Sequence, residues 1–449
     1  MLNAELADVG LHESMSRYGD LCIHAVLDLR RVFSREELER AAAATIEAFP
    51  VLGRAYEPRF WRDRWRRVEG PVSDLVHVVE APGDLEAETA VWARRPIAIA
   101  RERPLRIVSL RRSGGSRLIL SVTHCAVDGA GAAAVGHVLG SHLYGMPTSA
   151  PTDARRGVWT ALDRLRWYHW PALARDVAGA LVQPLRTFAA AARERPFSAR
   201  AARGAASWRH LVLSGPDVEQ IKLRCRAHGA SVNDALIAAL ARVGAGRSQG
   251  GPLAVTYTMD LRRYAASPRL TAANTSSILT AIVPRAAISD LATTAGAVAA
   301  ITSRHRQSLA GPAFLVAPMA LGAVLPHALT RRITRWLQPV LVDLPLSRGL
   351  LVTNVGRLDE GLAAFGDDIE AVRVIGPSFD GVSCPAVVAY GFRGELHLEL
   401  YAAPGLAPEA LLELEDELLT ALDLTAPGSA PQRAKHSGLK CLLPSESIV

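Results

Sequence analysis

The sequence feature that most constrains the fold is an apolar strand that enters a helix through a very short loop. Residues 117–124 read RLILSVTH and are mostly apolar, which predicts a strand. The loop CAVDG leads into AGAAAVGHVLGSHLYG, whose small and apolar residues recur at helical spacing. A strand, a tight loop and a helix in this order indicate a mixed α/β fold. His124 and Asp128 stand at the two ends of the loop.

Other predicted strands and helices surround this unit. LCIHAVLDL (21–29) and VLGRAYE (51–57) flank a helix that Ser34 caps, with Glu37 in the reciprocal position of a capping box. LRIVSL (105–110) and residues 117–124 flank RRSGGS, which predicts a hairpin. Beyond residue 206, the patterns predict strands at 208–214, 252–262, 276–285, 347–358, 371–379 and 384–402. They predict helices at 217–228, 230–243 and 409–422, and Ser231 and Asp234 resemble an N-terminal cap of the second of these helices.

The chain therefore divides into two units of similar α/β content. We predict a first lobe over residues 1–160, a helical connector over 161–205, a second lobe over 206–424 and a flexible tail over 425–449. Within 158–196, Arg and Trp lie on amphipathic helical stretches that Pro171 and Pro184 interrupt. Such a segment fits a connector packed across the two lobes, and also a lid or a contact with a membrane surface.

Composition excludes several functional classes. Hydrophobic residues make up 49% and charged residues 21%, which is globular composition and not that of a disordered chain. The net charge of +7 comes almost entirely from arginine, since the lysines are Lys222, Lys435 and Lys440 alone. No run of basic residues interleaves with aromatics, so nucleic-acid binding is not expected.

The cysteines and the apolar segments bear on the compartment. Cys22, Cys125, Cys225, Cys384 and Cys441 are an odd number without a C-x-x-C pair, which predicts a reducing compartment and no disulfides. No histidine or cysteine cluster has metal-ligand spacing, so no metal is expected. The N-terminal residues lack the apolar core of a signal peptide, and the apolar stretch 311–326 is too short and broken to span a bilayer. We expect a soluble, cytoplasmic protein.

The loop residues point to acid–base chemistry. A neutral imidazole at the end of a strand is rigidly held and can abstract a proton, and the ordinary histidine pKa of about 6.5 suits that work near neutral pH. Asp128 could orient this imidazole or pair with a buried arginine. Gly129 would allow a sharp turn into the helix. Cys125 could be a thiol nucleophile, although a cysteine in such a loop more often fills space.

The segment THCAVDG resembles the H-H-x-x-x-D-G motif of the condensation-domain and chloramphenicol-acetyltransferase-like acyltransferase superfamily. Further segments resemble the same superfamily in the expected order, and together they cover roughly residues 15 to 425. They are LDLRRVFSREELERAAAATIEAFPVLGRAY, SVNDALIAALARV, MDLRRY, AANTSSILTAIVPR and VTNVGRL.

The resemblance implies two acetyltransferase-like lobes in a V, with a tunnel between them and the motif at its floor. It implies that His124 is the catalytic histidine and that Asp128 is structural, paired with Arg262 of MDLRRY; Arg263 is the neighbouring alternative. Thr123 stands where the family has its first histidine, which is described there as a supporting residue. Asn274, Thr353 and Asn354 are candidates by position for oxyanion donors, and each could instead close a turn.

We therefore expect an acyltransferase in which His124 is the general base. It would move an acyl group from a coenzyme A or carrier-protein thioester to a hydroxyl or amine of a small-molecule or natural-product acceptor, with no tightly bound cofactor. The mildly basic surface would suit an acidic carrier protein or the phosphates of coenzyme A. The alternatives are a free-standing condensation enzyme for carrier-bound intermediates, a non-catalytic recruiting module, and a peripheral lipid-handling protein.

Overall fold

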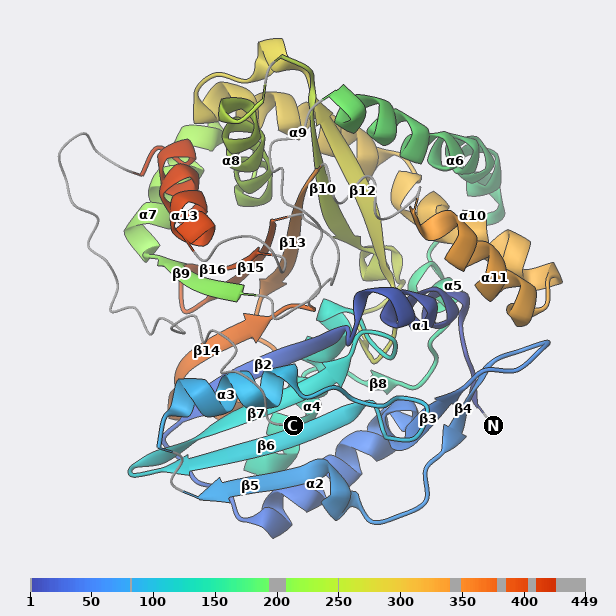
Figure 1. Cartoon of the computed structure of the whole chain (residues 1–449), viewed down its shortest axis with the longest axis vertical. Helices are drawn as coiled ribbons and strands as arrows, with labels where there is room; N and C mark the ends of the chain where they lie inside the picture. Colours follow the sequence, from blue (N-terminus) through green and yellow to red (C-terminus); the bar gives the residue numbers. More distant parts are fainter. Residues whose placement is uncertain are drawn as a thin grey trace, which may run out of the picture.

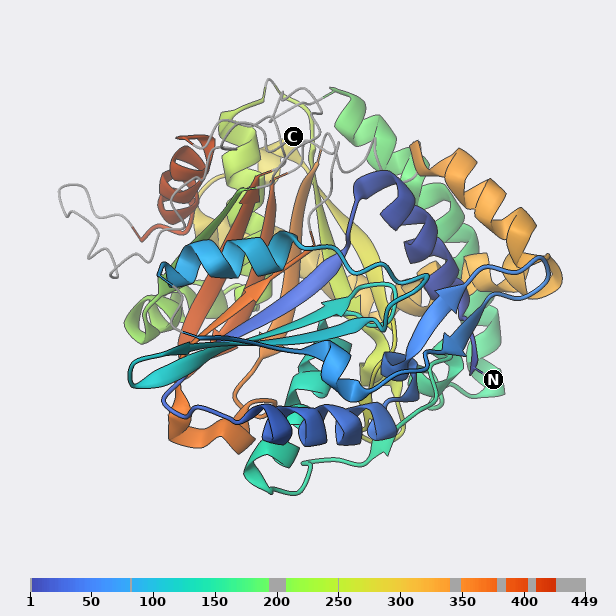
Figure 2. The same cartoon turned by 60° about the horizontal axis from the view of Figure 1, so that its bottom comes forward.

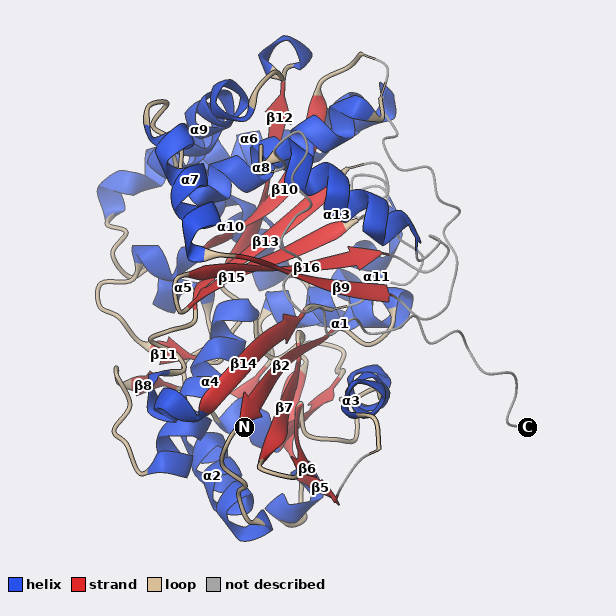
Figure 3. Ribbon diagram, turned by 90° about the vertical axis from the view of Figure 1, so that its left-hand side faces the viewer, coloured by secondary structure: helices blue, strands red, loops and turns tan. Residues whose placement is uncertain are grey.

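Two mixed β-sheets, each with helices packed on it, form the two lobes of the molecule (Figures 1 and 3). The computed structural model of the chain describes residues 2–80, 83–193, 207–248, 250–339, 349–377, 385–402 and 409–424. The predicted α/β class with two lobes is confirmed. The tunnel between the lobes stays a prediction.

The first lobe is built on a sheet that holds the loop described above. Its strands follow the order β14 (Ile369–Ile375), β2 (Cys22–Leu29), β7 (Gly115–Thr123), β6 (Leu105–Arg112) and β5 (Val76–Glu80). The helices of this lobe are α1 (Leu6–Tyr18), α2 (Arg35–Ala48), α3 (Leu85–Arg94) and α4 (Gly129–Tyr144). Helices α2 and α4 lie on one face of the sheet and α3 on the other (Figure 3). Strand β7 is buried along its whole length, in agreement with its apolar sequence.

The second lobe is built on a longer sheet. Its strands follow the order β12 (Ser276–Val283), β10 (Leu253–Asp260), β13 (Leu350–Arg357), β15 (Ala386–Phe392), β16 (Glu395–Ala402) and β9 (Ser207–Leu213). Helix α8 (Val232–Gly246) packs on β10 and β13, and its neighbours are α7 (Gly215–Arg226), α9 (Leu291–Gln307) and α13 (Glu409–Ala421). Helices α6 (Trp170–Arg193) and α10 (Ala310–Val324) pack on each other and on β12. Helix α11 (His327–Gln338) packs on α1 of the first lobe.

Smaller elements complete the fold around the first lobe. Strands β1 (Leu2–Asn3), β4 (Arg64–Arg67) and β3 (Arg54–Glu57) form one small sheet, and β11 (Leu270–Thr271) pairs with β8 (Thr152–Asp153). The short helix α5 (Val158–Ala161) begins the connector between the lobes.

Strand β14 lies in the first sheet, although its residues fall within the predicted second lobe. It follows β13 of the second sheet in the chain, but it pairs with β2 of the first sheet, and the chain then returns to the second sheet as β15. Phe365 and Val372 accordingly lie in the apolar core of the first lobe. One strand of the predicted second lobe, 206–424, and the segment that leads to it therefore belong to the first lobe. The sequence pattern of a strand does not identify the strand with which it pairs.

Several local predictions are confirmed at atomic detail. Ser34 caps α2 through a capping box with Glu37, and Ser231 caps α8 through the same arrangement with Asp234. The hairpin predicted at RRSGGS joins β6 to β7, with Arg112 opposite Gly115. In contrast, α6 runs unbroken through Pro184, and the first half of the predicted strand 51–57 is a short 3₁₀ turn, Pro50–Gly53. Helix α1 was not predicted.

Two features bear on the expected compartment. No helix in the described part of the chain is long and apolar enough to cross a membrane. Cys22, Cys125 and Cys225 are free and buried, while Cys384, Cys441 and the predicted tail 425–449 lie outside the described residues.

Candidate active site

The motif loop lies at the end of β7 and is held by backbone hydrogen bonds. The His124 amide donates to the Leu21 carbonyl at 2.6 Å, and the Ala126 amide donates to the Thr123 carbonyl at 3.0 Å. Thr123 is buried opposite Cys22 of β2, and its hydroxyl lies 3.6 Å from the Met15 sulfur. The Thr123 side chain therefore packs against α1, as a supporting residue would.

The His124 ring is partly exposed at this strand end. Its Nδ1 atom is buried without a hydrogen-bond partner, and no side chain or backbone group of the described residues bonds to its Nε2 atom. For Nε2 to accept a proton, the neutral ring must carry its hydrogen on Nδ1. The His124 backbone is therefore held by hydrogen bonds, while neither ring nitrogen bonds to another described residue.

Asp128 is bonded to the second lobe and not to His124. It caps α4 by accepting from the Gly131 amide at 2.7 Å, and it also accepts from the Thr275 amide at 2.8 Å and the Ser276 hydroxyl at 2.9 Å. Arg262 donates to both carboxylate oxygens at 3.0 Å. Both oxygens are occupied, so the structure favours the arginine-partner interpretation over that of an acid orienting His124.

The pair also sets the charge state of both side chains. Burial alone would raise the pKa of Asp128, but the Arg262 guanidinium and the hydrogen bonds hold it below its usual range. Burial would lower the pKa of Arg262, but the Asp128 and Asp260 carboxylates raise it. The structure thus selects Arg262 over Arg263, which is exposed and lies over the Tyr264 ring.

Gly129 begins α4, but not for the reason that we expected. Its backbone does not adopt a positive φ, and an added Cβ would meet Val355 at an ordinary contact distance of 3.6 Å. The crowded glycine is Gly131, where a Cβ would lie 3.1 Å from both the Ala273 carbonyl oxygen and the Val127 Cβ. The close approach of the two lobes therefore constrains residue 131 more than residue 129.

Asn274 holds the motif loop. Its side-chain amide nitrogen donates to the His124 carbonyl at 3.0 Å and to the Cys125 carbonyl at 3.1 Å. Both hydrogens of this amide are thus engaged, and the oxyanion role stays a prediction. Asn274 fixes the backbone of His124 from the second lobe.

The two other oxyanion candidates each donate one hydrogen bond to a neighbouring side chain. The Thr353 hydroxyl donates to the Thr258 hydroxyl at 3.3 Å, and the Asn354 amide nitrogen donates to the Asn233 side-chain oxygen at 3.3 Å. The Asn354 side-chain oxygen accepts from the Gly356 amide at 2.9 Å, where β13 has an irregularity and Gly356 takes a φ of 89°. Asn354 therefore closes a turn, which was the alternative interpretation.

Cys125 is a buried filler. Its thiol lies 3.3 Å from the Asp8 carbonyl oxygen, and burial raises its pKa well above the usual range. A nucleophilic cysteine requires the opposite shift and access to substrate.

Arg156 also holds the motif loop in place, and the sequence did not predict this role. Its guanidinium donates to the Ala126 and Ala272 carbonyls, both at 2.6 Å, and to the Asp8 carboxylate of α1 at 2.6 Å. Arg156 and Asp8 are both buried. Arg156 thus ties the motif loop, α1 and the second lobe together, but no motif marks it and its partners are distant in sequence.

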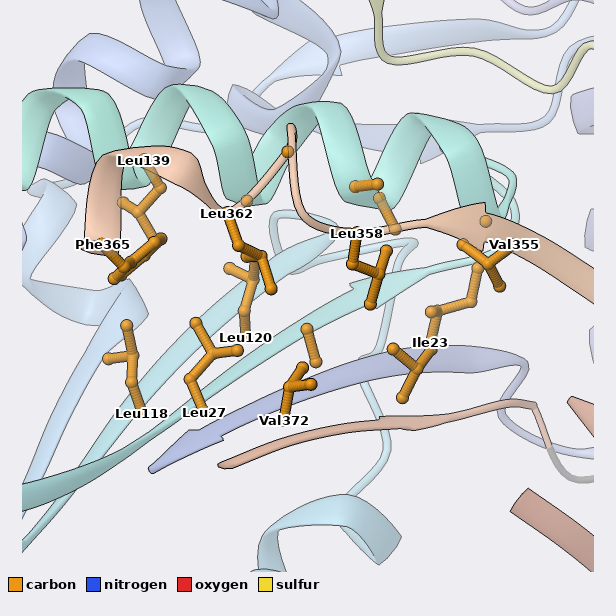
Figure 4. Close-up of a pocket in the computed structure, with 17 residues that line it drawn as sticks. Ile23, Leu27, Leu118, Leu120, Leu139, Val355, Leu358, Leu362, Phe365 and Val372 are labelled. Carbon is orange, nitrogen blue, oxygen red and sulfur yellow. The ribbon is translucent and has the colours of Figure 1, made fainter. Parts of the chain in front are cut away.

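An apolar pocket lies beside the motif, between α4 and the first sheet (Figure 4). Gly129 and Val355 line it near the loop, and Leu139 and Phe365 lie at the other end. The labelled side chains are all apolar, so the pocket supplies no acid or base. In the described part of the chain, no group of His, Cys, Asp and Glu is placed to hold a metal ion.

The comparisons with known proteins identify the fold. No family model and no curated protein matches the sequence. The first condensation domain of the CDA synthetase is 16% identical, with a TM-score of 0.66 over 96% of this chain and 97% of that chain. The TRI3 trichothecene 15-O-acetyltransferase from Fusarium sporotrichioides is 12% identical, with a TM-score of 0.68 over 94% of each chain. Polyketide synthase associated protein 5 from Mycobacterium tuberculosis is 15% identical, with a TM-score of 0.60 over 94% of this chain and 97% of that chain. The chain therefore has the two-lobed fold of these condensation-domain and acetyltransferase structures.

Proposed function

We propose that this protein is an acyltransferase in which His124 is the general base. It would move an acyl group from a coenzyme A or carrier-protein thioester to a hydroxyl or amine of a small-molecule acceptor. The observation that supports this proposal most is the partly exposed imidazole of His124, whose Nε2 atom has no hydrogen bond to another described residue. The loop that carries it is held by hydrogen bonds from both lobes. Condensation domains and an acetyltransferase among the structural neighbours support the same class of reaction.

The chemical steps follow from this geometry. Nε2 of His124 takes the proton of the acceptor as its oxygen or nitrogen attacks the thioester carbonyl carbon. A tetrahedral intermediate forms, and it collapses as the carbon–sulfur bond breaks. The imidazolium returns the proton to the leaving thiolate, so the ring ends neutral. General base catalysis of this kind contributes a rate factor of about 10²–10⁴.

Support for the role of the loop comes from its fixation. The Asn274 amide holds the His124 carbonyl, Arg156 holds the Ala126 carbonyl, and the Asp128–Arg262 pair holds the start of α4. A base fixed on a rigid element loses little entropy when it meets the acceptor.

The test is acyl transfer followed by intact mass. The protein is incubated with thioesters of coenzyme A and of carrier protein, carrying short and long acyl chains, and with candidate acceptors. We expect His124→Ala to lower turnover by about 10²-fold or more. Cys125→Ala should retain turnover, because the acyl group passes directly to the acceptor.

The outcomes separate the competing functions. Undiminished turnover by His124→Ala would contradict the base assignment. An acyl adduct on Cys125 that turns over would contradict direct transfer. Failure of the wild type with every donor would favour a non-catalytic module that recruits a partner.

A further inference from the structure

The strongly exposed aromatic side chains of this protein are concentrated on a few elements. Among the described residues, every Phe, Trp or Tyr with a largely exposed side chain comes from the β3–β4 loop, from residues 159–170 or from α11; they are Phe60, Trp61, Trp159, Trp167, Tyr168, Trp170 and Trp336. Figures 1 and 2 place the β3–β4 loop beside α11, and α6 packs on α10, which precedes α11. Such a concentration is unusual for a surface that meets only water.

Helix α11 turns polar side chains toward the protein and apolar side chains toward solvent. Arg331 and Gln338 face α1: Arg331 pairs with the buried Glu13, and Gln338 bonds to Ser14. Arg335 is largely exposed and also pairs with Glu13. Leu329 and Trp336 follow a different helical stripe and are exposed, Trp336 to 78%. A surface helix normally buries its apolar stripe, so the outer stripe of α11 lacks a partner in the described structure.

The β3–β4 loop is fastened to α11 and extends the same apolar surface. The His327 amide donates to the Trp61 carbonyl and the Ala328 amide to the Phe60 carbonyl, both at 3.0 Å. Arg62 donates to the Leu325 carbonyl at 2.8 Å. The Phe60 and Trp61 side chains, exposed to 64% and 66%, are therefore presented by a fixed loop. We call Phe60, Trp61, Val324, Leu329 and Trp336 the aromatic face.

The charge around the aromatic face is positive. The sequence has no Asp or Glu from residue 291 to residue 342, and none from 58 to 62. Glu13 and Asp63 are buried and paired with arginines of α11, and Glu57 at the end of β3 is paired with Arg59 and Arg64. Arg332 lies in the outer stripe, is exposed, and makes no ion pair with any other described residue.

We propose that the aromatic face docks on an anionic lipid membrane, with Phe60, Trp61 and Trp336 entering the headgroup region. Indole and phenyl rings partition to that region, and arginines at its edge are attracted by anionic headgroups. The helix lies in the plane of the surface and does not cross it. The inference is independent of the acyl-transfer proposal, since it uses none of the residues of the motif.

The experiment is flotation of the full-length protein with vesicles. One set holds phosphatidylcholine alone, and the other holds phosphatidylcholine with phosphatidylglycerol. We expect the wild type to float with the anionic vesicles and to dissociate as salt is raised. The variant Phe60→Ser/Trp61→Ser/Trp336→Ser should bind at least about tenfold more weakly, and Arg332→Gln should reduce the preference for anionic vesicles.

The matched control makes the same kind of change elsewhere. Leu223→Ser/Leu412→Ser removes two exposed leucines from α7 and α13, which lie on the opposite side of the molecule in Figure 1, and should float as the wild type does. Thermal unfolding verifies that all variants are folded. Equal binding by the triple variant, equal binding to neutral vesicles, or no binding by the wild type would overturn the proposal. A dimer that the triple variant abolishes, without vesicle binding, would mean that the face joins two copies of the chain.

Discussion

Asp128 is a residue of the first lobe that bonds directly to the second. The sequence resemblance implied its pairing with Arg262, and the structure contains that pair. Thr275 and Ser276, which also bond to Asp128, were not predicted, nor was Arg156. A motif names residues that lie together in sequence, whereas these contacts depend on how the lobes approach each other. The same limit applies to the bonds that Asn274 donates to the His124 and Cys125 carbonyls.

The Asp128–Arg262 pair should be costly to break from one side. Arg262→Met leaves the buried Asp128 carboxylate without its cation, and we expect a loss of about 3 kcal/mol in the free energy of unfolding. The double variant Asp128→Asn/Arg262→Met should lose less, because no charge is stranded. Urea unfolding measures both. A loss in Arg262→Met no larger than that in the double variant would contradict this account.

His24 should make the protein less stable in mild acid. Burial, with help from Arg106, lowers its pKa from 6.5 to about 4, and its Nδ1 lies 2.8 Å from the Ser121 hydroxyl. Between these pH values the unfolded chain binds the proton more readily than the folded chain. The contribution of neutral His24 to the free energy of unfolding is therefore complete above pH 6.5 and is lost as the pH falls toward 4. The loss amounts to about 3 kcal/mol.

The variant His24→Gln tests that pH dependence. Its unfolding free energy should fall less steeply between pH 6.5 and 4 than that of the wild type. Some slope should remain, because burial also lowers the pKa of His397 to about 4. Parallel curves for the two proteins would rule out His24 as the titrating group.

At the scale of elements, the sequence predicted best where local chemistry decides the structure. The capping boxes of α2 and α8 and the hairpin between β6 and β7 depend on neighbouring residues alone. Helix α1 was missed because the charges that hold it, Asp8 and Glu13, have distant partners. Pro184 was misread as a break, because α6 continues through it although proline is the least favourable residue in a helix interior.

The start of β7 offers a test of an element. A Cβ added at Gly115 would lie 2.2 Å from the Leu29 carbonyl oxygen, which belongs to the neighbouring strand and cannot rotate away. Gly115→Ala should therefore separate the end of the β2–β7 pair and cost about 1–3 kcal/mol of unfolding free energy. Ser113→Ala, in the exposed turn of the same hairpin, should change it by less than about 0.5 kcal/mol. Equal stabilities in thermal unfolding would show that the strands tolerate the added carbon.

At the scale of the whole molecule, β14 connects the two lobes. It pairs with β2 of the first sheet, and in the chain it lies between β13 and β15 of the second sheet. The sequence predicted a strand at this position, but not its sheet, because strand pairing over long sequence separations leaves no local pattern. A series of ion pairs, which we call the chain of charges, also connects the two sheets at β14. Arg373 of β14 donates to Glu399 of β16 at 2.7 and 2.9 Å and lies 3.4 Å from Glu86 of α3. Glu86 in turn contacts Arg117 of β7, which pairs with Asp28 of β2.

Breaking this chain of charges at Arg373 should weaken the whole molecule. Burial would lower the pKa of Arg373, but Glu399 raises it, so Arg373 keeps its positive charge. Arg373→Met strands the Glu399 carboxylate, which is only 1% exposed, and should cost about 3–5 kcal/mol in urea unfolding. Arg112→Met is the matched control, because it breaks an exposed arginine–glutamate pair at the same strand, with Glu370, and should cost less than about 1 kcal/mol. If the two variants unfold at the same urea concentration, the buried pair is not what couples the two sheets, and strand pairing alone must hold β14 against β2.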